Sequence, residues 1–398
     1  MTASDKRAAP RRVALLGSTG SIGRNTLDVI RAFPERFEVA ALAAGDNVAE
    51  LAQQIAAFRP RLAAIRCADK VPELRARLRE LGAPEPALAA GPEGLLAVAA
   101  AGDLLVAAVV GVAALEAIAA ALGRGCDVAL ANKEALVVAG PLLLAAARRS
   151  GAAVLPIDSE HSAVHQCLRG GGEFERIILT ASGGPLLRHS LADMAAVTPA
   201  EALRHPTWNM GARISLDSAT LMNKGFEVIE ACHLFGAAES QIEVMIHPQS
   251  IVHSLVEFSD GSTLAQMGAP DMRIPIQYAL TYPDRLPNTR MRLKLEEIGK
   301  LEFELPDARR FPCLALARAA FRAGGGAPAV LNAADEVAVA AFLEGRLAFT
   351  GIAPVVEQAL EQIGAPPVPG LEAVLDLDRA ARRIAAGLVE KTNARVST

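Results

Sequence analysis

The feature that most constrains the fold is a strand, a glycine-rich turn and a helix near the start of the chain. An apolar run at 12–16 ends in a turn with glycines at every third position: Gly17, Gly20 and Gly23. A helix-compatible stretch and a second apolar run at 37–43 complete a βαβ unit. Glycine lets the backbone turn tightly and approach a pyrophosphate, which would lie at the N-terminus of the helix starting near Ser21. The context favours a dinucleotide site over a simple turn.

The alternation of strands and helices continues, which predicts a parallel, doubly wound sheet. Its further strands are expected within 60–66, 103–110 and 126–131. Beyond residue 157 the strands follow one another more closely, at 174–181, 242–248 and 250–267, and Asp260-Gly261 is a hairpin signal. That part is therefore expected to be α+β with antiparallel strands, and the end of the chain to be a helical bundle.

The fold class expected from these patterns is α/β, with three domains. These are an N-terminal doubly wound, Rossmann-like dinucleotide-binding domain, a central α+β catalytic domain and a C-terminal helical bundle. The predicted boundaries are 1–157, 158–300 and 311–398.

Composition excludes several classes of protein. The net charge of −4 and the lack of a basic run argue against nucleic-acid binding. The most apolar segment, 103–122, is interrupted by Asp103, Gly111 and Glu116, so no membrane span is expected. Five scattered cysteines without C-x-x-C spacing suit reduced thiols, and no apolar leader precedes the first strand. A bacterial cytoplasmic protein is the expectation.

Two carboxylates follow the short apolar run 152–157: Asp158 and Glu160 in "IDSEHSA". Taken alone, the pair could be a solvated strand-to-helix turn. Glu227 supplies a third carboxylate, and three hard oxygen ligands suit Mg²⁺ or Mn²⁺ while leaving coordination positions for a substrate.

Hydroxyl, amide and ammonium groups surround the third carboxylate in the sequence. In "DSATLMNKGFE" we expect Ser218 in a loop and Asn223 and Lys224 at a helix start, a set of donors that suits a phosphate monoester. A polar cap on a buried helix is the alternative. Ser182, followed by two glycines after a strand, could hold a phosphate or simply make a turn. Trp208 suggests a lid, although core tryptophans are commoner.

"ANKE" follows the predicted strand at 126–131, on the sheet edge where ligands of open α/β sheets bind. Lys133 is therefore a candidate to touch substrate. A polar cluster at a helix N-terminus, with Glu134 favouring the dipole, is the alternative.

Together these segments resemble the 1-deoxy-D-xylulose 5-phosphate reductoisomerase family. "LGSTGSIG", "ANKE", "IDSEHSA", "ASGGP", "HPTWNMG", "DSATLMNKG", "HPQSIVHS", "MGAPDMR" and "NAADE" occur in order from residue 16 to 336. The resemblance implies a homodimer that binds a sugar-phosphate substrate, NADPH and Mg²⁺ or Mn²⁺. It also implies the isomerisation, by retro-aldol cleavage and re-addition, and reduction that yield 2-C-methyl-D-erythritol 4-phosphate.

The resemblance assigns roles to matching positions. The metal ligands and catalytic carboxylates are Asp158, Glu160 and Glu227, with Lys133 as a further catalytic residue. The remaining substrate-binding residues are Ser159, Ser182, His205, Trp208, Ser218, Asn223 and Lys224, and Met210 closes with Trp208 over the substrate. The residues assigned to the cofactor are Gly17, Thr19, Gly20, Ser21, Ile22, Gly45, Asn47, Asn132, Glu134 and Gly211.

The chain departs from the family pattern at Asp46, where a basic residue often lies near the cofactor's 2′-phosphate. An acid there favours a free ribose hydroxyl. Asp46 could instead cap the helix beginning at Val48, with Arg24 or Arg66 supplying positive charge. Two rival functions stay open at this point: a redox-neutral, metal-dependent sugar-phosphate isomerase or lyase, and a non-catalytic dinucleotide sensor.

Overall fold

The computed structural model describes residues 9–208, 210–287 and 292–396. The chain forms two compact units. Unit 1 comprises Met1–Asn132, Ala145–Ile157 and Met272–Leu286. Unit 2 comprises Lys133–Leu144, Asp158–Asp271 and Pro287–Thr398.

Unit 1 contains a parallel sheet in which seven strands are described, in the order β4-β3-β2-β1-β5-β6-β7. The strands are β1 Arg11–Leu16, β2 Phe37–Ala44, β3 Leu62–Ile65, β4 Ala87–Ala90, β5 Leu104–Ala107, β6 Asp127–Leu130 and β7 Val154–Pro156. The chain starts at β1, runs outward to β4, returns to β5 beside β1 and runs outward again. This is the predicted doubly wound topology, with its switch point between β1 and β5.

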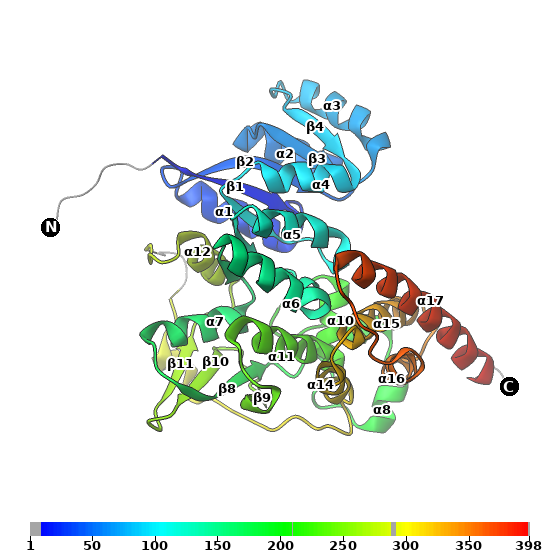
Figure 1. The fold of residues 1–398 in the computed structure, drawn as a ribbon. Helices are drawn as coiled ribbons and strands as arrows, with labels where there is room; N and C mark the ends of the chain where they lie inside the picture. Colours follow the sequence, from blue (N-terminus) through cyan, green and yellow to red (C-terminus); the bar gives the residue numbers. More distant parts are fainter. Residues whose placement is uncertain (1–8, 209, 288–291, 397–398) are drawn as a thin grey trace. The chain divides into compact units, whose positions relative to one another are not determined.

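Helices cover both faces of this sheet (Figure 1). They are α1 Ser21–Ala32, α2 Val48–Phe58, α3 Val71–Glu80, α4 Gly91–Ala100, α5 Leu115–Gly123 and α12 Arg273–Thr281. Leu27 of α1, Leu51 of α2 and Ile276 of α12 share one apolar core with the strands. Helix α4 packs against β1, β2 and β3. Because alternate strand residues face opposite sides, central strands covered on both faces are apolar throughout, as in "VALL" of β1.

Unit 2 contains a four-stranded sheet in the order β11-β10-β8-β9. Its strands are β8 Phe174–Ala181, β9 Ile242–Ile246, β10 Val252–Phe258 and β11 Thr263–Met267. The hairpin predicted at Asp260-Gly261 joins β10 to β11. The expected antiparallel strands are present, since β10 pairs antiparallel with β8 and with β11, but β8 and β9 pair in parallel, so the sheet is mixed. The chain between these two strands crosses over through helices, which supplies the long connection that a parallel pair requires.

The helices of unit 2 follow the chain from its middle to its end. They are α7 Ser159–Cys167, α8 Leu191–Ala195, α9 Pro199–Ala202, α10 Ala212–Thr220, α11 Met222–Phe235, α13 Leu295–Ile298, α14 Cys313–Ala323, α15 Ala327–Leu343, α16 Ile352–Ile363 and α17 Leu371–Val396. Helix α6, Lys133–Ser150, belongs partly to each unit and contains Pro141. Helices α14, α15, α16 and α17 pack together, which confirms the predicted helical region at the end of the chain.

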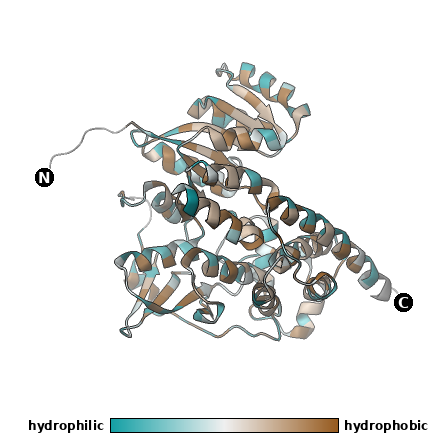
Figure 2. Cartoon of the chain, in the orientation of Figure 1, coloured by the Kyte–Doolittle hydropathy of each residue, from teal (hydrophilic) through white to brown (hydrophobic). Residues whose placement is uncertain are grey.

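The sequence prediction located most strands and missed β4. "ALAA" is four residues long and follows two prolines, so nothing in its local sequence distinguishes a strand from a loop. The three functional domains with boundaries at 157, 300 and 311 stay a prediction. Figure 2 shows polar and apolar residues alternating around the helices, as packing against a core requires. None of the described helices combines the length and the apolar character needed to cross a membrane.

Candidate active site

The glycine-rich turn of unit 1 is shaped by the absence of side chains. Gly17 has φ +85° and follows β1, and a Cβ added there would lie 2.4 Å from the carbonyl oxygen of Ala108, just past β5. A Cβ on Gly23 would lie 2.2 Å from the oxygen of Gly17. The backbone therefore passes too close to itself for any other residue. The turn lies at the switch point of the sheet, where open α/β sheets bind ligands.

Helix α1 begins beyond this turn without a side-chain cap. Its first amide groups cannot bond within the helix, so they are available to an anion. Thr19 and Ile22 are half-buried, and Gly20 and Ser21 are exposed. The hydroxyl of Ser18 is a buried polar group without a hydrogen-bond partner. These features fit the pyrophosphate of a dinucleotide.

The next strand ends carry two other predicted cofactor residues. Asn47 caps α2 by accepting a hydrogen bond from the Glu50 amide at 3.1 Å. The alternative that Asp46 caps this helix was therefore wrong: its carboxylate pairs with Arg66 instead. A Cβ added at Gly45 would meet no atom within 4 Å, so the space next to this residue is open.

Asn132 follows β6, and its side chain holds the neighbouring strand end. Its amide donates to the carbonyl oxygen of Gly111 at 2.8 Å and to that of Val109. The residue is 3% exposed, so within unit 1 it ties the segment after β6 to the segment after β5.

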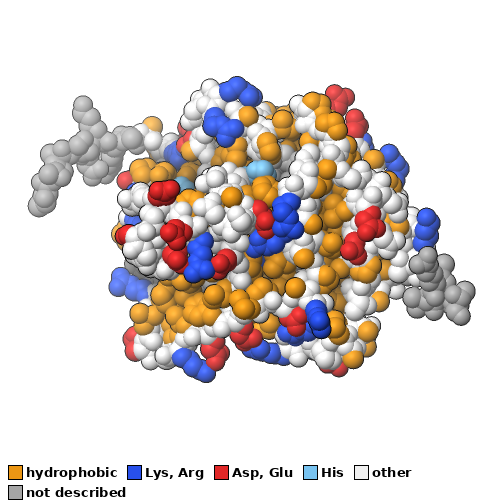
Figure 3. Space-filling view, turned by 60° about the horizontal axis from the view of Figure 1, so that its bottom comes forward, with side chains coloured by type: hydrophobic (Ala, Val, Ile, Leu, Met, Phe, Trp, Pro, Cys, Tyr) orange, Lys and Arg blue, Asp and Glu red, His pale blue; other side chains and the backbone are white. Residues whose placement is uncertain are grey.

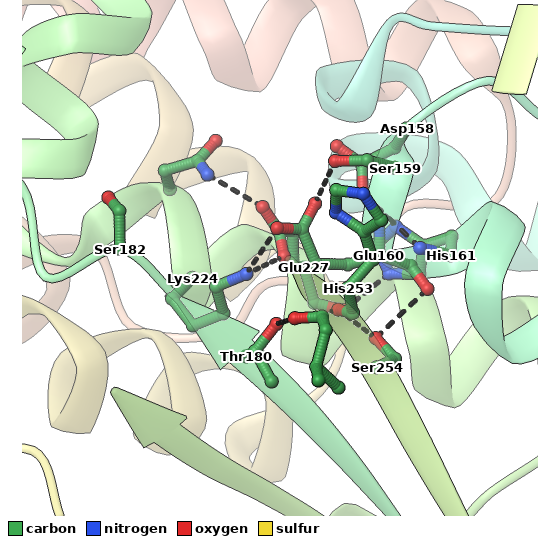
Figure 4. Close-up of polar contacts among 12 residues, drawn as sticks. Asp158, Ser159, Glu160, His161, Thr180, Ser182, Lys224, Glu227, His253 and Ser254 are labelled. Carbon is green, nitrogen blue, oxygen red and sulfur yellow. Dashed lines mark hydrogen bonds and ion pairs between the residues drawn. The ribbon is translucent and has the colours of Figure 1, made fainter. Parts of the chain in front are cut away.

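The predicted carboxylate triad of unit 2 is brought together. Asp158, Glu160 and Glu227 each offer an oxygen, and these oxygens all lie within 4.8 Å of one another. Asp158 is 9% exposed and Glu227 is 1% exposed, which rules out a merely solvated turn. Asp158 also caps α7 by accepting hydrogen bonds from the amides of Glu160 and His161, so the cap itself turns this carboxylate toward the triad. Figure 4 shows the three side chains converging.

Two lysines lie among these carboxylates. Lys133, the first residue of α6, contacts Asp158 and lies 3.7 Å from Glu227. Lys224 contacts Glu227 and lies 3.5 Å from Glu160. Both ammonium groups are nearly inaccessible, and each neutralises part of the negative charge that burial makes unfavourable.

The electrostatics of the triad indicate a site for a cation. The pKa of Glu227 is raised to about 8, chiefly by burial and also by the charges of Asp158 and Glu160, against the opposing effect of Lys224. Burial also disfavours the Asp158 carboxylate, but Lys133 and His161 outweigh it and hold that pKa well below its usual range. A carboxyl group that resists ionisation beside two others becomes a strong ligand once a divalent cation supplies the missing charge.

Sequence reasoning missed His161 and Glu230, which support the triad. His161 Nδ1 lies 3.0 Å from the Asp158 carboxylate and Nε2 lies 2.9 Å from the backbone oxygen of Glu227. Nδ1 is also 3.5 Å from Glu230. Burial opposes a charged imidazole, but Glu230 and Asp158 raise the pKa of His161 to about 9. The available signal was helical spacing, since His161 follows Asp158 by three residues and Glu230 follows Glu227 by three.

Three predicted substrate residues contact the triad or lie beside it. Ser159 donates to the Glu160 carboxylate at 2.6 Å. Asn223 donates to Glu227 at 2.6 Å, and Lys224 contacts the same carboxylate. The structure thus joins these predicted substrate residues to the carboxylates of the triad.

A second polar group forms around the "ASGG" turn after β8. Ser182 lies 2.8 Å from His205 Nε2, and the Gly184 amide donates to the Ser182 hydroxyl at 3.2 Å. Gly184 has φ +70°, and a Cβ there would lie 2.6 Å from the oxygen of Ser218. Three predicted phosphate-binding and loop residues, Ser182, His205 and Ser218, are therefore neighbours.

The expectation that Ser218 lies in a loop was wrong. It lies in α10, which ends at Thr220, and Leu221 with φ +59° turns the chain directly into α11. The cluster of hydroxyls in "SLDSAT" disguised a helix that buries Leu216 and Ala219.

The segment after α9 holds the predicted lid residues. The Trp208 amide donates to His205 Nδ1 at 2.9 Å, and the Trp208 and His253 rings lie 6.5 Å apart. Trp208 and Met210 are half-buried, and the intervening residue 209 lies outside the described part of the chain. The side chain is therefore not a fully buried core tryptophan.

Two residues assigned to the cofactor lie in unit 2. Gly211 is exposed at the start of α10, and a Cβ there would meet no atom within 4 Å. Glu134 is 8% exposed, and its charge acts on Arg213 of α10.

Comparison with known proteins gives one family along the chain. The model described as 1-deoxy-D-xylulose 5-phosphate reductoisomerase matches residues 13–140. The model of the 1-deoxy-D-xylulose 5-phosphate reductoisomerase C-terminal domain matches residues 154–235. A further model, described as the DXP reductoisomerase C-terminal domain, matches residues 267–384. The 1-deoxy-D-xylulose 5-phosphate reductoisomerase of Moorella thermoacetica is 54% identical over 384 residues, 96% of this chain and 98% of the relative. That of Pelotomaculum thermopropionicum is 54% identical over 94% of this chain and 97% of the relative.

Solved structures agree. The Zymomonas mobilis reductoisomerase in complex with NADPH is 44% identical with a TM-score of 0.89, covering 96% of this chain and 99% of that one. A reductoisomerase in complex with NADPH, fosmidomycin and magnesium is 43% identical with a TM-score of 0.89, covering 96% of this chain and 98% of that one.

Proposed function

The chain belongs to the 1-deoxy-D-xylulose 5-phosphate reductoisomerase family, and from this premise we propose how its residues carry the reaction. It is an enzyme that isomerises 1-deoxy-D-xylulose 5-phosphate and reduces the product with NADPH to 2-C-methyl-D-erythritol 4-phosphate. The observation that carries the proposal is the carboxylate triad, in which Asp158 and Glu227 are buried, Glu160 is half-buried and the ligand oxygens lie within 4.8 Å of one another.

Asp158, Glu160 and Glu227 would hold Mg²⁺ or Mn²⁺. Their hard oxygen atoms and their burial fit such an ion, and relatives are solved with magnesium. The ion would polarise the carbonyl of the substrate as a Lewis acid. His161 fixes Asp158 and the backbone of Glu227 by hydrogen bonds at 3.0 and 2.9 Å, which keeps two ligand positions in place. We assign to Lys133, whose ammonium contacts Asp158 of the triad, the donation of a hydrogen bond to a substrate oxygen.

Ser182 and His205 would bind the phosphate of the substrate. His205 Nδ1 accepts from two backbone amides, of Thr207 and Trp208, so in the neutral ring the proton is on Nε2, facing Ser182. The Ser182 oxygen therefore accepts from both His205 and Gly184, and its own hydrogen remains to be donated to an anion. Burial lowers the pKa of His205, which favours this neutral form. Ser218, Asn223 and Lys224 complete the proposed set.

NADPH supplies the hydride for the reduction. The turn at Gly17–Gly23 would bind its pyrophosphate. Its close backbone contacts and the uncapped start of α1 support this role. We also assign nucleotide contacts to Asn47 and Asn132, and to Gly45, Glu134 and Gly211 on the resemblance alone.

The experiment follows NADPH absorbance with 1-deoxy-D-xylulose 5-phosphate, in chelated protein and again after Mg²⁺ or Mn²⁺ is added. Metal-dependent oxidation is expected. Product without NADPH consumption would indicate a redox-neutral isomerase instead. NADPH binding by folded protein without any product would indicate a sensor.

We further propose a homodimer that uses the outer face of the unit 2 sheet. Leu255 pairs with Ile178 on one side and Ala265 on the other, and these side chains face away from the core that contains Ile177 and Val256. Figure 3 shows hydrophobic side chains gathered on the face that it brings forward. Light scattering should give twice the chain mass, and Leu255→Arg should give the monomer; a monomeric wild type would contradict the proposal.

A cytoplasmic location is proposed from the thiols. All five cysteines are free, and Cys67 is exposed, which suits a reducing compartment. Fractionation of the source cells would test this location.

A further inference from the structure

Two neighbouring strand ends of unit 1 bring a carboxylate and a guanidinium together. Ala44, the last residue of β2, is in register with Ile65, the last residue of β3. Asp46 is the second residue after β2 and Arg66 the first after β3, and the Arg66 amide donates to the Ala44 oxygen at 3.1 Å. Both residues therefore lie at the carboxyl edge of the sheet. In dinucleotide-binding sheets, residues at this edge bind the 2′ position of the ribose. An acidic residue there accepts a hydrogen bond from the 2′-hydroxyl of NADH, whereas an arginine binds the 2′-phosphate of NADPH.

The two side chains form an ion pair. Arg66 Nε donates to the Asp46 carboxylate at 3.2 Å, and a terminal nitrogen contacts the other oxygen. The side chains are 69% and 46% exposed, so the pair is open to a ligand. A guanidinium has five N–H groups, and only part of them is engaged by one carboxylate. The carboxylate thus holds the guanidinium in place and leaves some of its N–H groups to donate to a ligand.

Arg24, the other cation considered from the sequence, is engaged elsewhere. It donates to the backbone oxygen of Thr19 at 2.6 Å and lies 3.2 Å from the Glu50 carboxylate. Without Arg66, the charge of Asp46 would repel a 2′-phosphate and accept a hydrogen bond from a 2′-hydroxyl. The preference between the two dinucleotides should therefore depend on Arg66.

We propose that Arg66 recognises the 2′-phosphate of NADPH in this chain, and that Asp46 positions its guanidinium. This inference rests on the proposed function, because it requires that unit 1 bind NADPH. It assigns cofactor specificity to the end of β3 and explains how an acid after β2 is compatible with NADPH.

The test measures dissociation constants of NADPH and NADH for the full-length protein by fluorescence titration. Arg66→Ala should weaken NADPH binding by about tenfold or more and leave NADH binding unchanged or tighter. Arg66→Lys should keep part of the preference as a point charge. Asp46→Asn keeps an acceptor oxygen for the guanidinium but removes a negative charge near the phosphate, so the affinity ratio should shift toward NADPH. Asp46→Ala removes the acceptor as well, so the guanidinium should lose its position and NADPH affinity should fall below that of Asp46→Asn. The matched control is Arg61→Ala, an arginine 78% exposed at the opposite end of β3, which should change neither constant.

A selective loss of NADPH affinity in Arg66→Ala supports the inference. Equal changes for both dinucleotides, or none, in a wild type that prefers NADPH would overturn it and leave the proposed function intact. A folded wild type that binds neither dinucleotide would overturn both.

Discussion

The glycine-rich turn of unit 1 and the carboxylate triad of unit 2 prepare for charged ligands in opposite ways. The turn offers backbone amides and excludes side chains, so it meets an anion without any formal charge of its own. The triad concentrates carboxylates in a buried place and balances them with Lys133 and Lys224. The first site is sensitive to added volume, and the second to removed charge.

The largest expected effect tests the charge-based site. Glu227→Gln keeps the shape of the side chain but removes a ligand, so activity at limiting Mg²⁺ should fall by roughly 10³-fold, since metal ions contribute several kcal/mol to catalysis. Metal affinity measured by calorimetry should fall with it. The matched variant Glu230→Gln removes a buried carboxylate one turn further along α11 and should lose less. Full activity of Glu227→Gln would contradict the metal assignment.

The second prediction tests the volume-based site. Gly23→Ala places a Cβ 2.2 Å from the Gly17 oxygen, so the turn must move. NADPH affinity should fall by at least about tenfold and the free energy of unfolding by about 1–3 kcal/mol. Gly123→Ala, at the end of α5 with nothing within 4 Å, is the control and should leave both unchanged. Equal behaviour of the two variants in titration and thermal melting would remove the steric argument.

The third prediction separates phosphate binding from local stability. Ser182→Ala removes a hydroxyl donor, so KM for the substrate should rise by about tenfold, the value of one hydrogen bond to a charged group. Ser190→Ala removes the cap of α8 and should lower stability by about 1 kcal/mol without changing KM. If both variants changed KM alike, Ser182 would have only a structural role.

The smallest effect concerns a buried cluster that the proposed chemistry does not use. Burial and the neighbouring Asp217 raise the pKa of Asp335 well above its usual range, although Arg213 lies 3.3 Å away. The folded state therefore keeps this proton longer than the unfolded state, and stability falls as pH rises from about 4, the unfolded value, through the folded pKa. Asp335→Asn should remove that decline and gain stability above pH 4 in denaturant titrations. An unchanged pH profile would show that Arg213 fully compensates the charge.

The two sites also differ in how far the sequence predicts them. The turn is local, because strand, glycines and helix lie within "ALLGSTGSIG", and the structure has each where it was expected. The triad joins residues that are 67 positions apart, from Glu160 to Glu227, so residue chemistry suggested it but only the fold brings the oxygens together. His161 was missed because its spacing of three residues from Asp158 is common in any helix, and nothing near it in the sequence identifies Glu230 or the backbone of Glu227 as its other partners. Ser218 was misplaced because its hydroxyl-rich neighbours are typical of loops as well as of helix ends.

The pair Asp46–Arg66, at the edge of the sheet, is another contact that the sequence alone does not predict. The sequence presented an acid after β2 and left its partner open, since a cap and an ion pair both suit aspartate. The register between β2 and β3 decides the matter by placing Arg66 beside it.

The most direct test of the central claim is a crystal of the protein grown with Mn²⁺, examined by anomalous scattering at the manganese edge. An anomalous peak is expected within coordination distance, about 2–2.5 Å, of carboxylate oxygens from Asp158, Glu160 and Glu227. A structure with the triad ordered, the substrate bound and no peak among these oxygens would contradict it.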